Sequence, residues 1–402
     1  MDDKKIKILR KAKQIFTSSN PLIIENGSIV FDDKIIWIGK DSDLPSEYLK
    51  LASKVIDVSD KVILPGFVDP HTHLVFYGDR IIEFELRLKG FDYLKIREMG
   101  GGILKTVKDT RNANKEQIKK YVKKFIRKFI EYGTTTIEAK SGYGLDLENE
   151  IKILEITNEL NDKPITIVPT FLVHDFIDDR EKYVNEVIKN LEIIKQKNLA
   201  KFVDVFCERG VFEIEQTRKI LSKAKKLGFL LKLHTDEFYN IGGTKLGVEF
   251  NAVSLDHLNE ISDNDIKLIS KSKTVCVLLP STTFLLRKNK YPPARKLIDS
   301  GCTIALGTDF NPGTSFTQNM QFVILLSVML LNMKIEEAIL ASTINSAKAI
   351  DMDKFVGSLE VGKFADFIVF DFDDYRYLVY NGAVNNLKMV FKKGKIIAFH
   401  KD

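Results

Sequence analysis

The chain has 402 residues with 44% hydrophobic and 29% charged side chains, a balance that predicts a globular protein with one large domain and a smaller one. Its net charge of +6 comes from lysines scattered along the whole length, which argues against nucleic-acid binding, and no apolar run is long enough to span a membrane. Three cysteines in unrelated apolar segments (Cys207, Cys276 and Cys302), together with a charged N-terminal stretch, predict a cytoplasmic protein without a disulfide framework.

The two ends of the chain are rich in short strands and turns. Near the N-terminus, two apolar runs on either side of Asp32 and Asp33 predict a β-hairpin. Near the C-terminus, turn residues separate three apolar runs, at 366–371, 387–391 and 395–399. We therefore expect residues 1–64 and 357–402 to form one small, discontinuous β-sandwich domain.

Between these ends, in residues 65–356, apolar strand candidates alternate with lysine-rich amphipathic helices. The clearest helical patterns are at 115–131, 181–198 and 213–227. The strand candidates are 66–72, 134–140, 165–173, 202–208, 229–234, 252–257, 274–279 and 303–309. Eight strand–helix repeats predict an α/β fold, a (β/α)8 TIM barrel.

Reactive groups in such a barrel lie at the C-terminal ends of the strands. The first, fifth, sixth and eighth strand candidates end in His71 and His73, His234, His257, and Asp309, respectively. Alternate residues of a strand point to the same face, so His71 and His73 can bind one ion together. With His234 and Asp309 they would offer three nitrogens and one oxygen, which suits zinc or iron. The sequence therefore predicts one Zn²⁺ or Fe³⁺ per chain, which would lower the pKa of a bound water.

The order of these residues resembles that of the amidohydrolase superfamily. The stretches LPGFVDPHTH (64–73) and GSLEVGKFADFIVFD (357–371) match its opening and closing motifs, so the resemblance covers nearly the whole chain. Many members hold two metals bridged by a carboxylated lysine at the end of the fourth strand. Here that strand reads FVDVFCE, without a lysine. The resemblance therefore implies a single metal, which leaves His257 for proton transfer or for polarising the substrate.

Further segments resemble the imidazolonepropionase family within this superfamily. They are HLVFYGDR (73–80), FELRLKG (84–90), GGGILKTVKDTR (100–111), KSGYGL (140–145), DVFCERGVF (204–212), LHTDEF (233–238), YPPARKLIDSG (291–301) and TDFNPGTS (308–315). The resemblance implies an enzyme of histidine degradation that acts on a small molecule. It would hydrolyse the cyclic amide of 4-imidazolone-5-propanoate to N-formimidoyl-L-glutamate. The family also suggests a homodimer.

The propionate of this substrate needs a cation near the metal. Arg80 lies seven residues beyond His73, in the first loop above the barrel, and its planar guanidinium can pair with a carboxylate through two hydrogen bonds. The resemblance adds further substrate contacts, which are Tyr143, His174, Glu237, Asn311, Gly313 and Thr314.

Proton transfer is expected from three residues. Glu237 or His257 would protonate the ring nitrogen that leaves, and Asp309 would take a proton from water. Two alternatives remain open. Another single-metal amidohydrolase, such as a guanine or cytosine deaminase, would share the ligands but would not need Arg80. A barrel that has lost its metal could serve as an interaction scaffold, although the intact set of ligands argues against this.

Overall fold

Eight parallel strands form one of the two sheets of this computed structural model, which describes residues 6–91, 99–382 and 384–400. Neighbouring strands are hydrogen-bonded in chain order from β6 to β13. Thr72 forms a parallel bridge with Phe310, and the Thr308 amide donates to Asp69, so the two edges of the sheet meet in a nearly closed barrel. The strands are β6 Phe67–Asp69, β7 Thr134–Lys140, β8 Thr166–Val173, β9 Phe202–Cys207, β10 Leu230–Thr235, β11 Ser254–His257, β12 Val275–Leu278 and β13 Ile304–Leu306.

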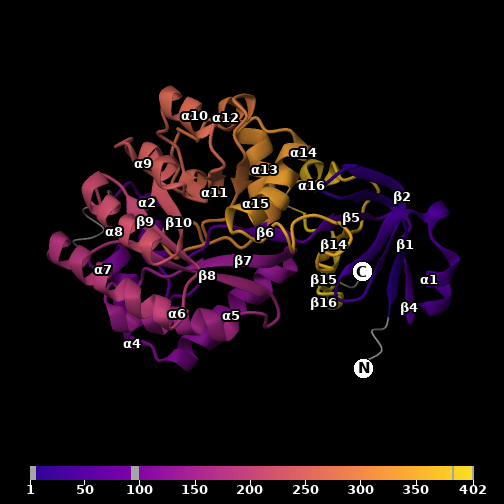
Figure 1. The fold of residues 1–402 in the computed structure, drawn as a ribbon, viewed down its shortest axis with the longest axis horizontal. Coiled ribbons are helices and arrows are strands. Elements are labelled where there is room, and N and C mark those ends of the chain that lie inside the picture. The colour runs from indigo at the N-terminus through magenta and orange to yellow at the C-terminus, as the bar shows by residue number, and fades with distance from the viewer. Residues whose placement is uncertain (1–5, 92–98, 383, 401–402) are drawn as a thin grey trace.

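Helices surround this barrel (Figure 1). They are α2 Ile81–Leu88, α4 Ile103–Asn112, α5 Lys115–Glu131, α6 Leu147–Leu160, α7 Arg180–Gln196, α8 Ile214–Lys226, α9 Gly243–Phe250, α10 Asp263–Ile269, α11 Pro280–Leu285, α12 Ala294–Asp299, α13 Met320–Leu330, α14 Ile335–Ala341 and α15 Ile344–Ala349. Helix α5 illustrates their sequence pattern. Asn114 and Gln117 form a reciprocal capping box at its start, and Ile118, Val122 and Phe125 place a buried apolar stripe on one face.

The predicted α/β barrel is confirmed, with all eight strands present. Helices α5, α7 and α8 lie where their amphipathic patterns predicted them. The first and eighth strands end earlier than predicted. Strand β6 ends at Asp69 and leaves His71 and His73 beyond it, and β13 ends at Leu306 and leaves Asp309 beyond it. The backbone there is held by isolated contacts instead. The Asp309 amide donates to the His71 carbonyl at 3.1 Å, and the His73 amide donates to Phe310 at 2.8 Å.

The two chain ends meet in a second, mixed sheet, where indigo and yellow strands lie together in Figure 1. Its order is β16-β15-β14-β5-β1-β2-β3, and β4 pairs with β1 beside this path. The expected sandwich is thus one hydrogen-bonded sheet built from both ends. Its strands are β1 Lys7–Phe16, β2 Ile23–Phe31, β3 Ile35–Lys40, β4 Lys54–Asp57, β5 Val62–Pro65, β14 Phe367–Phe370, β15 Leu387–Lys392 and β16 Lys395–Phe399, accompanied by η1 Asp41–Asp43, α1 Ser46–Leu51 and α16 Tyr377–Tyr380.

Strand β5 joins the two sheets. It pairs antiparallel with β14, and only Gly66 separates it from β6 of the barrel. A Cβ atom on Gly66 would lie 2.4 Å from the Thr135 side chain, so this close crossing requires glycine. The domain boundaries at 64/65 and 356/357 remain a proposal, and the first of them falls within β5. In the described part of the chain, no helix is both long and apolar enough to cross a membrane.

Candidate metal centre and substrate cavity

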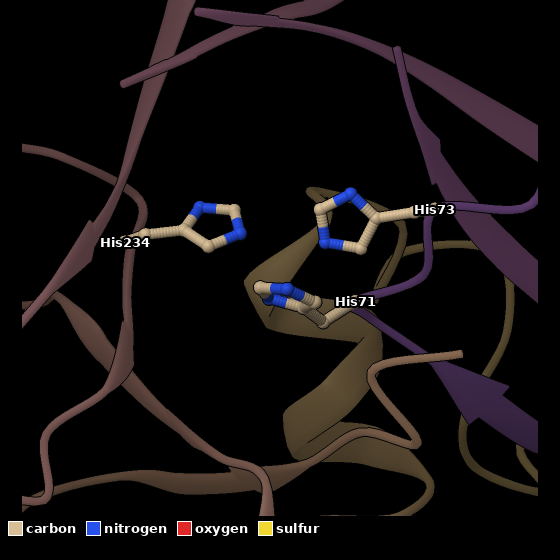
Figure 2. Close-up of side chains that lie close together, drawn as sticks. All are labelled: His71, His73 and His234. Carbon is tan, nitrogen blue, oxygen red and sulfur yellow. The ribbon is translucent and has the colours of Figure 1, made fainter. Parts of the chain in front are cut away.

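Three histidines converge at one end of the barrel. His71 and His73 follow β6, His234 lies in β10, and their rings turn toward a shared space (Figure 2). Their candidate ligand atoms all lie within 4.8 Å of one another, and all three side chains are buried. Nε2 of His71, Nδ1 of His73 and both ring nitrogens of His234 have no hydrogen-bond partner among the described residues. Buried nitrogens without a partner are costly, and a bound metal would satisfy at most one nitrogen of each ring.

Asp309 places an oxygen beside two of these rings. Its Oδ1 lies 3.4 Å from Nε2 of His71 and 3.4 Å from Nε2 of His73. A tetrahedral zinc site, with bonds of about 2.0–2.1 Å, has neighbouring ligand atoms about 3.4 Å apart. The other carboxylate oxygen accepts a hydrogen bond from Thr282 at 2.5 Å. The three histidines therefore fit a metal ion, and the Asp309 carboxylate lies beside two of them as a candidate oxygen ligand.

The charge of Asp309 also suits a ligand. Burial would raise the pKa of its carboxyl group, but hydrogen bonds with His71 and His73 and the charges of His71 and His257 hold that pKa well below its usual range. The Asp309 backbone has a positive φ of 50°, a conformation for which Asp is one of the more tolerant residues. The chain is thus bent at the residue that aims the carboxylate at the histidines.

Two buried carboxylates lie close to the Nδ1 atoms of His71 and His234. Nδ1 of His71 pairs with Oδ2 of Asp256 at 2.6 Å. Nδ1 of His234 lies 3.1 Å from Oδ2 of Asp204, within ion-pair distance although outside hydrogen-bond geometry. The Lys140 ammonium connects the two carboxylates, at 2.7 Å from Asp204 and 3.4 Å from Asp256. Such partners orient metal-ligating rings and fix their tautomers.

The network continues inside the barrel through Glu138 and Lys232. Lys140 and Lys232 lie 2.9 Å and 3.2 Å from Oε1 of Glu138, and Lys232 also donates to the Pro70 carbonyl at 2.9 Å. Sequence reasoning missed this network. The available signal was the polar residue at every second position of an otherwise apolar strand, as in TIEAK (136–140) and LKLH (231–234).

The histidine cluster opens into a cavity of about 530 Å³. Most of the predicted site residues line it, and these are His73, Arg80, Tyr143, His174, His234, Glu237, His257, Asp309, Asn311 and Thr314. Gly313 does not line this cavity. It lies behind Arg80 instead, where a Cβ atom would be 2.2 Å from Nη1 of the arginine. The position of Gly313 therefore indicates that it makes room for the guanidinium.

His257 and Glu237 form a pair on the cavity wall. Nε2 of His257 lies 3.6 Å from Oε2 of Glu237. Burial lowers the pKa of His257 to about 3 and raises the pKa of Glu237 to about 8, although the Lys288 ammonium acts against the second shift. His257 has a φ of 82°, which is unusual for a residue with a Cβ atom and is typical of functional positions. At neutral pH the pair therefore offers a neutral imidazole and a carboxyl group that retains its proton.

Tyr143 and His174 lie next to the metal cluster. The ring of His73 is 5.9 Å from that of Tyr143 and 5.3 Å from that of His174, between centroids. Burial lowers the pKa of His174 to about 3, so its ring is neutral. Its Nδ1 atom is buried without a partner in the part of the chain that the structure describes. Both side chains are thus placed where a bound molecule would meet them.

Asn311 uses its side chain to shape its own loop. Its Oδ1 accepts from the amides of Gly313 at 2.8 Å and Thr314 at 2.7 Å. Its Nδ2 donates to the Asp309 carbonyl and to the Thr314 hydroxyl, both at 2.7 Å. The amide group is therefore engaged within the loop, and its predicted contact with substrate remains a prediction.

Comparisons with known proteins identify the family of this chain. Residues 62–397 match the amidohydrolase family model. The chain is 45% identical over 383 residues to an imidazolonepropionase of Fusobacterium nucleatum, a match that covers 94% of this chain and 92% of the relative. It is 42% identical over 409 residues to an imidazolonepropionase of Clostridium tetani, covering 97% of each.

Solved structures share the fold at low sequence identity. A triazine hydrolase variant aligns with a TM-score of 0.78 at 15% identity, covering 98% of this chain and 95% of that one. Ochratoxinase of A. niger aligns with a TM-score of 0.74 at 19% identity, covering 99% and 97%. These structures bear on the architecture alone, whereas the sequence matches decide the family. The chain belongs to the imidazolonepropionase family of the amidohydrolases.

Proposed function

We propose that this protein is an imidazolonepropionase, which hydrolyses 4-imidazolone-5-propanoate to N-formimidoyl-L-glutamate. Its family membership supports this reaction. The observation that carries the proposal is that one cavity of about 530 Å³ is lined by Arg80 and by members of the histidine cluster. A molecule with a carboxylate at one end and a cyclic amide at the other matches this arrangement of a cation and a metal centre.

In this proposal Arg80 holds the propionate. Its side chain is only 9% exposed, so a carboxylate that pairs with it loses water and gains charge-assisted hydrogen bonds. Tyr143, which is also buried, would contact the ring or the propionate. Together these contacts would place the amide carbonyl beside the histidine cluster.

The metal centre would hold zinc or iron on His71, His73, His234 and Asp309. A metal ion there would supply Lewis acidity toward water and toward the carbonyl oxygen of the amide. His257, a neutral ring at the same cavity wall, would donate a hydrogen bond to that oxygen. The identity of the metal is part of the proposal.

Two side chains, Asp309 and Glu237, would accept and donate the protons. The ionised carboxylate of Asp309 accepts the proton of the attacking water. A carbon–oxygen bond then forms at the carbonyl carbon, and the bond from this carbon to the ring nitrogen breaks. Glu237, which retains its proton at neutral pH, would protonate the nitrogen as it leaves, because the neutral ring of His257 has no acidic proton to give. The products are a new carboxylate and the formimidoyl group.

The test compares two arginines of the same cavity. Arg80→Met should raise KM for 4-imidazolone-5-propanoate more than tenfold, because a lost charge pair of this kind is worth about 2 kcal/mol or more. Arg209, which also lines the cavity but stacks on Tyr239 at 4.2 Å, is the matched control. Arg209→Met should leave KM within about twofold of the unsubstituted enzyme, an effect of about 0.4 kcal/mol or less.

The reaction products decide the substrate. N-formimidoyl-L-glutamate should appear in proportion to the substrate consumed, as followed by absorbance and mass spectrometry. Turnover of guanine or cytosine together with no turnover of the imidazolone would contradict the proposal. An unchanged KM in Arg80→Met would contradict the assignment of the propionate to Arg80.

A further inference from the structure

Glu83 is buried between two arginines at the start of α2. Its side chain is 5% exposed. Its Oε2 accepts a hydrogen bond from Nε of Arg80 at 2.7 Å, and its Oε1 accepts from Nη2 of Arg80 at 2.5 Å. Oε1 also accepts from Nη1 of Arg87 at 3.0 Å. Both carboxylate oxygens of Glu83 therefore accept hydrogen bonds from guanidinium groups.

The contact with Arg80 has a defined geometry. A guanidinium group can pair with a carboxylate along its side, through Nε and Nη2, or along its end, through Nη1 and Nη2. Glu83 occupies the side of Arg80. The end is then the edge that Glu83 leaves for a second carboxylate, and glycine at 313 gives this end room, because a Cβ atom there would clash with Nη1 at 2.2 Å.

The same carboxylate ties neighbouring segments together. Oε2 of Glu83 accepts from the Gly102 amide at 2.8 Å, at the residue that precedes α4. Arg87 spans from Glu83 to the Gly313 carbonyl, to which its Nη2 donates at 2.6 Å. Helix α2, the start of α4 and the loop after β13 are thus held around the guanidinium of Arg80.

We propose that Glu83 is a positioning residue for the substrate carboxylate, which acts by fixing the side of Arg80 so that its end faces the propionate. This inference rests on the proposed function, because it takes Arg80 as the propionate anchor. Burial by itself would raise the pKa of Glu83, but its contacts with Arg80 outweigh burial and hold the pKa below its usual range. Glu83 is therefore a carboxylate throughout the neutral range.

The main alternative is that Glu83 only compensates charge. Two arginines and one glutamate leave one net positive charge at this position. If compensation were the whole role, removing the negative charge would strengthen the attraction for an anion, and KM would fall. If Glu83 positions Arg80, the loosened guanidinium binds the propionate less well, and KM rises. The two roles predict changes of opposite sign.

The first experiment measures KM and kcat for 4-imidazolone-5-propanoate in Glu83→Gln and Glu83→Asp. Glutamine keeps the shape of the side chain but presents an NH₂ group to the arginine donors. Aspartate keeps the negative charge but is one methylene shorter, so the charge lies further from Arg80. A positioning role predicts that both variants raise KM by about tenfold or more with little change in kcat, since small displacements of an anchor are costly. A lower KM in Glu83→Gln with an unchanged KM in Glu83→Asp would overturn the proposal.

The matched control is Glu85→Gln, on the same helix. Glu85 is 63% exposed and pairs with Lys89 at 2.6 Å, so its loss removes the same charge without releasing Arg80. Its KM should stay within about twofold of the unsubstituted enzyme, an effect of about 0.4 kcal/mol or less. Metal content should be unchanged in all three variants. A rise in KM that came with loss of metal, or that Glu85→Gln reproduced, would overturn the positioning role.

A binding experiment separates this inference from the proposed function. Imidazole-4-propionate carries the propionate arm, and 4-methylimidazole lacks it. The unsubstituted enzyme should bind the first more tightly, and Glu83→Gln should reduce this preference by about tenfold. If the enzyme shows no preference, the carboxylate site itself is wrong and the inference falls with it. If the preference exists and Glu83→Gln retains it, the inference alone is wrong.

Discussion

The charge of Lys288 acts on the pKa of Glu237, the proposed proton donor. Burial raises the pKa of Glu237 to about 8, the Lys288 ammonium acts to lower it, and the carboxylates of Asp309 and Glu208 act to raise it. A general acid must retain its proton, so kcat/KM should fall as pH rises through the pKa of Glu237. Lys288→Met removes the lowering influence and should move this alkaline limb to higher pH.

The measurement is the pH profile of kcat/KM for the two enzymes. Lys290→Met is the matched control, because Lys290 is 64% exposed, pairs with Glu260 and lies two residues further along the chain. Its alkaline limb should stay where it is in the unsubstituted enzyme. A limb that moves to lower pH in Lys288→Met, or does not move, would show that Glu237 is not the proton donor.

At the level of elements, the buried network joins β7, β9 and β11 beside the metal centre. Lys140 is fully buried and lies between Asp204 and Asp256. Lys140→Met should lower the free energy of unfolding by about 3–5 kcal/mol, because buried charges lose their partner. It should also weaken metal binding about tenfold to a hundredfold, because His71 and His234 lose the orientation of their carboxylate partners.

Lys392 provides the control for this prediction. It lies in β15 of the mixed sheet, is 4% exposed and pairs with Asp366 at 2.6 Å. Lys392→Met should also lose stability but should bind metal normally, as measured by competition with a chelator and by thermal unfolding. If both variants lost metal equally, the network would act only through the general stability of the fold.

The elements also show what the sequence could and could not predict. Eight strand candidates were recognisable because each barrel strand is a short run of apolar residues followed by a helical pattern. The end of β6 was not recognisable from the sequence. Beyond it, the backbone of His71 and His73 is held by isolated hydrogen bonds rather than by a regular strand ladder. The role of Gly313 beside Arg80 depends on a contact between residues more than 200 positions apart, which a single sequence does not reveal.

At the scale of the whole molecule, the metal centre depends on closure of the barrel. His71 and His73 follow the first strand of the barrel, whereas Asp309 follows the last. The bridge between Thr72 and Phe310 brings these two edges together. The cluster of His71, His73 and His234 could be predicted as a group from strand ends, because a closed barrel gathers such residues at one rim. The paired carboxylates and the ion network could not, because they depend on which strands become neighbours.

A metal titration tests whether turnover depends on one metal ion per chain. The protein is stripped of metal with a chelator, zinc or ferric iron is added back in known amounts, and loss of 4-imidazolone-5-propanoate is followed by its absorbance. Turnover should be absent in the stripped protein and should rise in proportion to added metal up to one ion per chain. Full turnover by protein shown to be free of metal, or a rise that continues to two ions per chain, would contradict the account.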